Sequence, residues 1–78
     1  MGKKVKPEEL DGILATLNHS IRHTGRYLMA QGRNGHMAVD IYRGEASEGF
    51  NGVAVDVLAV GTTAECLKAA EAYAKNPH

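Results

Sequence analysis

Cysteine is nearly absent from this chain, since Cys66 is the only one among 78 residues. A single cysteine excludes an intrachain disulfide and any zinc site built on several cysteines. A chain of this length has room for one domain with a thin core, and such small domains often depend on a disulfide, a metal or self-association. Of these three supports we expect self-association, and therefore a homodimer.

Long apolar runs and an excess of either charge are also missing. No stretch approaches the roughly 20 apolar residues of a membrane-spanning helix, and the basic start of the chain lacks the apolar segment of a signal peptide. Nine basic and nine acidic side chains cancel, which excludes a global field that would attract nucleic acid or an anionic membrane. We therefore expect a cytoplasmic protein without membrane contact.

Motifs for catalysis or nucleotide binding are absent from the sequence. The glycines fall at expected turns and strand ends, and none forms a phosphate loop between a strand and a helix. His19 and His23 have the i, i+4 spacing that can hold a metal on a helix, but the sequence offers no third ligand, so we expect solvated histidines. Cys66 lies on an apolar helical stripe and is expected in the core. We predict a non-enzymatic protein without metal or cofactor.

A flexible basic arm is expected over residues 1–6, followed by a single α+β domain over residues 7–76. The first helix is predicted to begin at Pro7, because proline suits the first helical position, and to stop near Gly25. One face of this helix is apolar and is expected to pack on a sheet. The residues of this face are Leu10, Ile13, Leu14, Leu17 and Ile21.

The dipeptide Asn34-Gly35 predicts a two-residue hairpin turn of type I′ within the segment Arg26 to Arg43. This turn fixes the register of the two strands, which ends with Arg26 opposite Arg43. Because side chains alternate along a strand, one face of the hairpin is apolar and is expected in the core. The residues of this face are Leu28, Ala30, Met37, Val39 and Ile41.

A loop from Gly44 to Gly52 leads to a third strand, Val53 to Val60, and we expect Phe50 to fold from the loop onto the core. Thr62-Thr63-Ala64-Glu65 matches a capping box, and the helix that follows ends near Asn76-Pro77. The predicted fold is helix, three-stranded antiparallel meander, helix, with both helices packed on one face of the sheet. On the third strand, the residues expected on the core side are Val53, Val55, Val57 and Ala59.

The sheet face away from the helices is the first candidate site. It is predicted to present a larger apolar patch than a monomer usually leaves in water. We expect it to bind protein, either a second copy of the chain or a foreign partner, with tyrosines supplying contact area. The candidate interface residues are Tyr27, Met29, Asp40, Tyr42, Asp56 and Leu58.

Asp40 and Asp56 are neighbours on this face if the third strand pairs Ile41 with Val55. Like charges placed opposite each other are unfavourable, and such a pair would hold a cation, receive a partner's arginines or share a proton in acid-base chemistry. In the alternative, the third strand is shifted by two residues and both carboxylates are solvated. The long connection before this strand leaves its register open.

Basic side chains form the second candidate site, for a phosphate, an acidic surface or nucleic acid. Arg26 and Arg43 are predicted to face each other at the open end of the hairpin. In the other interpretation the arginines cap carbonyls of the first helix and pair with Glu45 and Glu48. The residues of this second site are Arg22, Arg26, Arg33 and Arg43, with Lys3, Lys4 and Lys6 of the arm.

The order helix, three antiparallel strands, helix is similar to that of the double-stranded-RNA-binding domain over almost the whole chain. That family binds phosphate with a lysine cluster at the start of its second helix. Here that position reads Thr62-Thr63-Ala64-Glu65-Cys66-Leu67-Lys68, so the resemblance implies a topology and no binding residues. The chain also resembles small accessory proteins of phages and mobile elements, which commonly act by occupying, and so inhibiting, a host protein.

Overall fold

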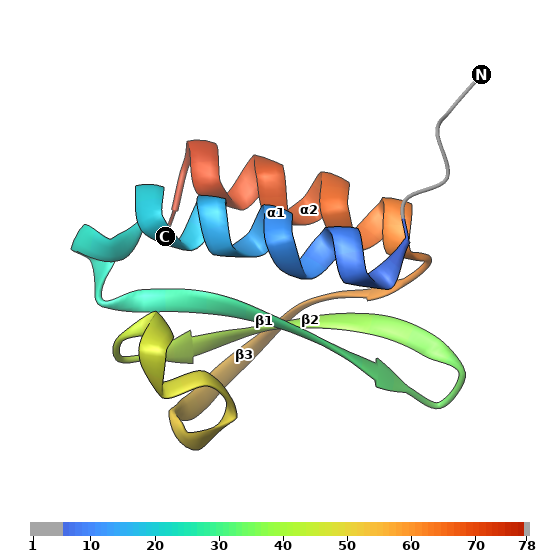
Figure 1. Cartoon of the computed structure of the whole chain (residues 1–78), viewed down its shortest axis with the longest axis horizontal. Coiled ribbons are helices and arrows are strands. Elements are labelled where there is room, and N and C mark those ends of the chain that lie inside the picture. Colours follow the sequence, from blue (N-terminus) through green and yellow to red (C-terminus); the bar gives the residue numbers. More distant parts are fainter. Residues whose placement is uncertain (1–5, 78) are drawn as a thin grey trace.

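A computed structural model describes residues 6–77 and confirms the predicted fold (Figure 1). Two helices lie side by side on one face of a three-stranded antiparallel sheet, whose strand order is β1-β2-β3. Two short 3-10 helices occupy the connections on either side of the hairpin. The elements are α1 (Pro7–Ser20), η1 (Arg22–Thr24), β1 (Arg26–Arg33), β2 (His36–Arg43), η2 (Ala46–Asn51), β3 (Val53–Gly61) and α2 (Thr63–Lys75).

The predicted basic arm, residues 1–6, lies outside the described residues apart from Lys6. The helices and strands all fall within residues 7–75 of the described range. Within residues 6–77, no helix is both long and apolar enough to cross a membrane.

α1 begins where predicted, at Pro7, with Glu8 and Glu9 at the positive end of the helix dipole. Its α-helical part ends at Ser20, earlier than predicted. The chain then tightens into η1 and leaves it through Gly25, whose φ of 72° lies in the left-handed region. Gly25 therefore ends the whole helical segment, although the last turn is of the 3-10 type.

The β1–β2 hairpin has the predicted register along its whole length, as far as Arg26 opposite Arg43. Asn34 and Gly35 have φ values of 52° and 80°. These are the two positive φ angles that a type I′ turn requires. Local turn chemistry is therefore sufficient to align these two strands.

β3 does not follow the predicted alternation, because two β-bulges interrupt its pairing with β2. The pairing skips Leu58 and Val55, and each extra residue reverses which side of the sheet the following side chains occupy. Leu58 and Ala59 pack against the core, whereas Val55 and Val57, predicted on the core side, are exposed. The same correction applies to Val53, which is 55% exposed.

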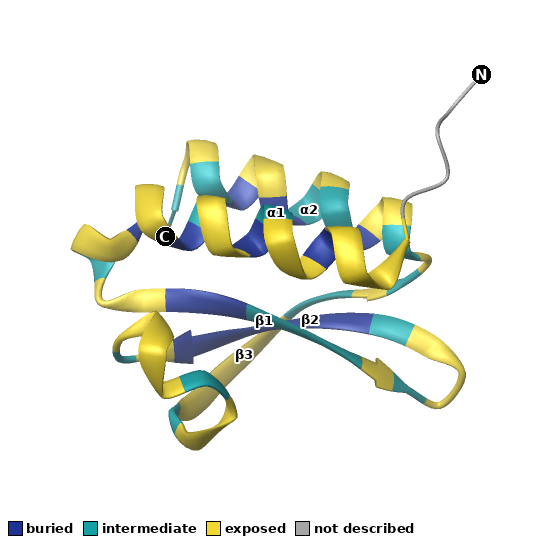
Figure 2. Ribbon diagram, in the orientation of Figure 1, coloured by how far each residue is buried: buried dark blue, intermediate teal, exposed yellow. Residues whose placement is uncertain are grey.

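The core lies between the helices and the sheet, where Figure 2 shows the buried segments facing each other. On α1 and just after it, Leu10, Leu14 and Ile21 are buried as predicted, and Ile13 and Leu17 are half-buried at the margin. Burying a side chain of this size stabilises the fold by about 1.5–3 kcal/mol. This layer is thus the main source of stability in a chain with no disulfide.

α2 begins with the predicted capping box. The Thr62 hydroxyl accepts a hydrogen bond from Glu65 N–H (3.1 Å), and the Glu65 carboxylate accepts one from Thr62 N–H (2.9 Å). Hydrogen bonding from Thr62, chiefly from its backbone N–H, lowers the pKa of the Glu65 carboxyl group because it favours the charged form. Cys66, Ala70 and Tyr73 then face the core on the buried stripe of the helix.

Candidate functional site

η2 lies on the side of the sheet opposite the helices and closes part of the face that the sequence predicts to be open (Figure 1). Tyr27 and Tyr42, predicted as exposed contact residues, are only 1% and 7% exposed. Their rings stack at a centroid distance of 5.4 Å, and Phe50 of η2 meets Tyr42 edge-on at 6.1 Å. The prediction of exposed tyrosines is therefore wrong, because η2 packs on them.

A backbone contact fixes η2 over the tyrosines. The Tyr27 hydroxyl donates a hydrogen bond to the carbonyl of Gly49 (2.6 Å). Burial raises the pKa of this phenol, and the nearby Glu48 carboxylate raises it further. Phe50 itself stays 54% exposed and packs on the outer face, not on the core as predicted.

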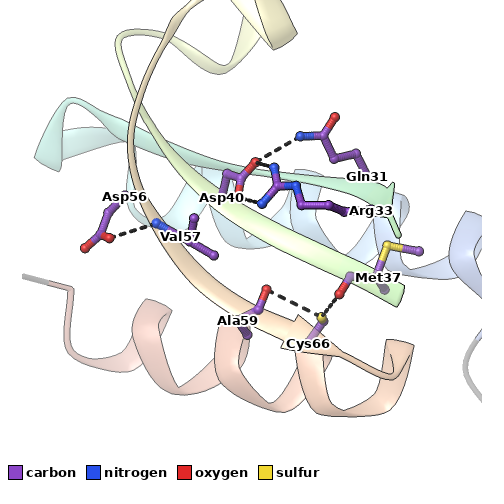
Figure 3. Close-up of polar contacts among 8 residues, drawn as sticks. All are labelled: Gln31, Arg33, Met37, Asp40, Asp56, Val57, Ala59 and Cys66. Atoms are coloured by element: carbon purple, nitrogen blue, oxygen red, sulfur yellow. Dashed lines mark hydrogen bonds and ion pairs between the residues drawn. The ribbon is translucent and has the colours of Figure 1, made fainter. Parts of the chain in front are cut away.

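Asp40 lies on the same outer face but is 4% exposed. Its carboxylate accepts hydrogen bonds from Arg33 Nη2 (2.7 Å) and Nη1 (3.3 Å), and from Gln31 Nε2 (3.0 Å) (Figure 3). The hydrogen bonds to Asp40, and its charge, raise the pKa of the Arg33 guanidinium. This charge pair is formed within the chain, so Asp40 is a buried structural residue and not an exposed anchor.

Asp56 does not meet Asp40, because Asp40 pairs with Val57 and Asp56 pairs with Ile41. Neither register considered from the sequence is observed, since the bulges shift β3 by a single residue at this point. Asp56 is exposed, and its carboxylate accepts a hydrogen bond from Val57 N–H (2.8 Å) (Figure 3). The aspartate pair that would have supported acid-base chemistry or cation binding is therefore not formed.

The two remaining candidate interface residues are only half-buried. Leu58 was predicted on the open face, but as a bulge residue it packs against the core from the helix side. Met29 keeps its predicted place on the outer face of β1, and it borders a hollow between α1 and η2 that Phe50 also lines. The central residues of the predicted interface are thus buried, and only residues at its margin remain accessible.

The exposed apolar surface lies instead along β3, as Figure 2 shows by its exposed colour. Val57 and Val60 are 50% and 52% exposed on the outer face, beside Asp40 and Ala38 of β2. We call this set the β3 surface. Its residues are Val53, Val55, Val57 and Val60.

The two edges of the sheet differ in how their backbone is protected. On β1, Asn18 of α1 accepts a hydrogen bond from Leu28 N–H (2.7 Å) and donates one to Leu28 C=O (3.0 Å), so one buried side chain satisfies the outward groups of this residue. Hydrogen-bonding directions alternate along an antiparallel strand. The β2 partners of Ala54, Val57 and Val60 direct their N–H and C=O groups to β1. These three β3 residues therefore direct their own N–H and C=O groups outward, away from β2.

Asn18 was not identified from the sequence, although its spacing contains a signal. It lies four residues after Leu14 and three before Ile21, within the apolar stripe of the helix. A polar residue at such a position must find a partner when it is buried.

The predicted arginine site is only partly assembled. Arg22 and Arg26 line one hollow of about 570 Å³ at the end of the sheet, with Tyr27 and Glu45 in the same wall. Arg22 donates to the carbonyl of His19 (2.7 Å), as the capping interpretation predicts. Arg43 lies opposite Arg26, whereas Arg33 is at the far end of the hairpin.

The two glutamates proposed as arginine partners take part in a local structure. The Glu48 carboxylate accepts a hydrogen bond from Glu45 N–H (2.7 Å), as part of the capping box that begins η2. These contacts therefore stabilise the first turn of η2.

The remaining titratable groups of residues 6–77 do not form a recognisable chemical centre. In the part of the chain that the structure describes, no group of three or more potential metal ligands comes together. The Cys66 thiol is buried and donates to the carbonyl of Met37 (3.3 Å), and burial raises its pKa (Figure 3). Such a thiol stays protonated and is a poor nucleophile.

Comparisons with models of protein families, with curated protein sequences and with solved protein structures find no match to this chain. No relative therefore supplies a substrate, a partner or an activity.

Proposed function

We propose that this chain is a non-enzymatic protein-binding domain whose contact region is the β3 surface. The observation that carries the proposal is the exposure of four valines on one edge strand of the sheet, each between 44% and 55%. Exposed apolar side chains gathered on one element commonly mark interaction sites.

The sequence of β3 supports the same interpretation. Edge strands are commonly guarded by lysine, by proline or by a covering segment, because their unpaired backbone groups attract other strands. β3 has no lysine, arginine or proline, and Asp56 is its single charged residue. Two features protect the edge of β3. They are its two bulges and the hydrogen bond that Asp56 accepts from Val57 N–H. Asn18 occupies the outward backbone groups of Leu28 on the opposite edge, so binding by strand addition is favoured at β3.

The basic alternative receives less support from the geometry. Arg33 is engaged by Asp40 and Arg22 by a helix carbonyl. Nucleic-acid binding would therefore have to displace these contacts or rely on the remaining arginines. Within our proposal the chain acts in the cytoplasm and away from membranes, and its resemblance to phage accessory proteins stays a prediction.

The proposal is tested by placing a photo-crosslinking amino acid at position 57 in cells that produce the chain. We expect a covalent adduct with a protein, identified by mass spectrometry, and loss of that complex in the purified Val57→Lys variant. The matched control carries the same crosslinker in place of Thr16, which is exposed on α1. No adduct at position 57, or equal adducts at both positions, would contradict a binding role for the β3 surface.

A further inference from the structure

We propose that the protein bound by the β3 surface is a second copy of this chain, joined by antiparallel pairing of the two β3 strands across a two-fold axis. This inference rests on the proposed function and names its partner. The result is a continuous six-stranded sheet with all four helices on one side. A two-fold arrangement is closed, since each copy presents the same strand to the other.

The positions of the outward backbone groups select a register. Ala54 and Val57 both direct their N–H and C=O groups away from β2. An antiparallel pair that places Ala54 opposite Val57 of the second copy has its axis between Val55 and Asp56. The N–H and C=O groups of Ala54 and Val57 then form hydrogen bonds between the two strands.

The charges of the chain allow this register. The formal net charge is +0 at pH 7, so two copies approach without long-range repulsion. Asp56 lies opposite Val55 of the second copy, so the two aspartates do not stand directly opposite each other, although the two-fold axis leaves both on the same face of the new sheet. Like charges are therefore not placed opposite each other, which would oppose pairing.

The space around the strand also fits a second copy. Residues 53–57 are exposed, and this half of β3 runs away from the helices in Figure 1, so the helices of two copies do not collide there. Beside Leu58, the small residues Ala69 and Ala72 of α2 form part of a hollow of about 330 Å³. In the proposed register Val53 of the second copy lies opposite Leu58, next to this hollow.

The amount of surface sets the expected strength. A standard interface buries about 800 Å² on each partner, and a nine-residue strand is only about 30 Å long. The strand and the adjoining hollow form a small interface, so we expect a dimer that dissociates at roughly micromolar concentration. Asp56 weakens it further, since it occupies the N–H of Val57 that the second copy needs.

Two variants at the axis should therefore change dimerisation in opposite directions. The solution mass is measured by light scattering over a range of concentrations, with circular dichroism to show that each variant is folded. Val57→Lys should raise the dissociation constant at least about tenfold, and Asp56→Ala should lower it by a similar factor because it frees the Val57 N–H. Thr16→Lys carries the same change of charge as Val57→Lys on α1 and should leave the constant unchanged.

The outcomes separate this inference from the proposed function. A wild-type chain that stays monomeric at all concentrations overturns the dimer, while a foreign protein crosslinked at position 57 would still support the binding role. A dimer that survives Val57→Lys, or that Asp56→Ala weakens, overturns the proposed pairing of β3 with β3. Opposite shifts in the two variants, with an unchanged Thr16→Lys control, support it.

Discussion

Asn18 shows how one side chain can satisfy the outward backbone groups of an edge residue in a small sheet. It reaches from α1 to β1 and forms two hydrogen bonds with the backbone of Leu28, in a site where the asparagine is 7% exposed. The amide group thus imitates the edge of a neighbouring strand. A buried backbone group that loses its only partner costs about 1–3 kcal/mol.

We expect Asn18→Ala to destabilise the chain by about 2–3 kcal/mol, because it leaves the N–H and C=O of Leu28 unpaired in a buried place. Urea unfolding monitored by circular dichroism measures this change. The matched control is Thr16→Ala on the exposed face of the same helix, with an expected effect within about 0.5 kcal/mol. Equal effects of the two substitutions would show that the Asn18 contacts do not stabilise the fold.

The pKa of the Tyr27 phenol makes the stability of the fold depend on pH in the alkaline range. Its pKa is raised in the folded chain, chiefly by burial, so the folded state holds the phenolic proton more tightly than the unfolded state. The contribution is complete below the unfolded pKa of about 10, and it is lost as pH rises from there through the raised pKa. Above a pH of about 10, we expect the Tyr27→Phe variant to lose stability less steeply with pH than the wild-type chain. The midpoints of urea unfolding at each pH measure this. Parallel pH profiles would contradict this.

η2 is the element on which the sequence-based account of the outer face fails. Its glycines and polar residues predict a loop, whereas the structure forms a short 3-10 helix within this connection. Nothing in their pattern specifies that the loop turns back over Tyr27 and Tyr42. That placement depends on tertiary contacts of η2 with the hairpin, namely the hydrogen bond from the Tyr27 hydroxyl to Gly49 and the contact of Phe50 with the Tyr42 ring.

Gly52 gives a test of how tightly η2 is held. A β-carbon at this position would collide with the hydroxyl of Tyr27, so we expect Gly52→Ala to cost about 1–3 kcal/mol. The cost should be smaller in a Tyr27→Phe background, where the colliding oxygen is absent. As a control, Gly12→Ala on exposed α1, with no atom within 4 Å of its added carbon, should stabilise the chain by about 0.5–1 kcal/mol. A harmless Gly52→Ala would mean that η2 is loosely attached.

The register of β3 could not be predicted from the sequence, for a different reason. The hairpin register follows from Asn34-Gly35 because a two-residue turn fixes it, whereas β3 follows a longer connection with a helix of its own. Its sequence is apolar at almost every position, so it gives no sign of where a bulge reverses the alternation. The prediction of buried Val55 and exposed Leu58 was wrong for this reason.

For the whole molecule, the fold could be predicted because each element carries its own signal. Pro7, the Asn-Gly turn and the capping box at Thr62 mark boundaries by local chemistry, and the apolar stripes of the helices require one sheet face. The candidate site could not be predicted in the same way. It depends on which edge remains open, and that is decided by tertiary contacts of Asn18, η2 and the bulges.

The β1 edge is closed at Leu28, whereas the β3 edge is open to a partner strand. Amide hydrogen exchange tests this difference most directly, by comparing Leu28 with Ala54 in dilute and in concentrated protein. We expect slow exchange at Leu28 in both samples, and fast exchange at Ala54 that slows in the concentrated sample. Exchange at Ala54 that is as slow as at Leu28 in dilute protein would contradict an open β3 edge.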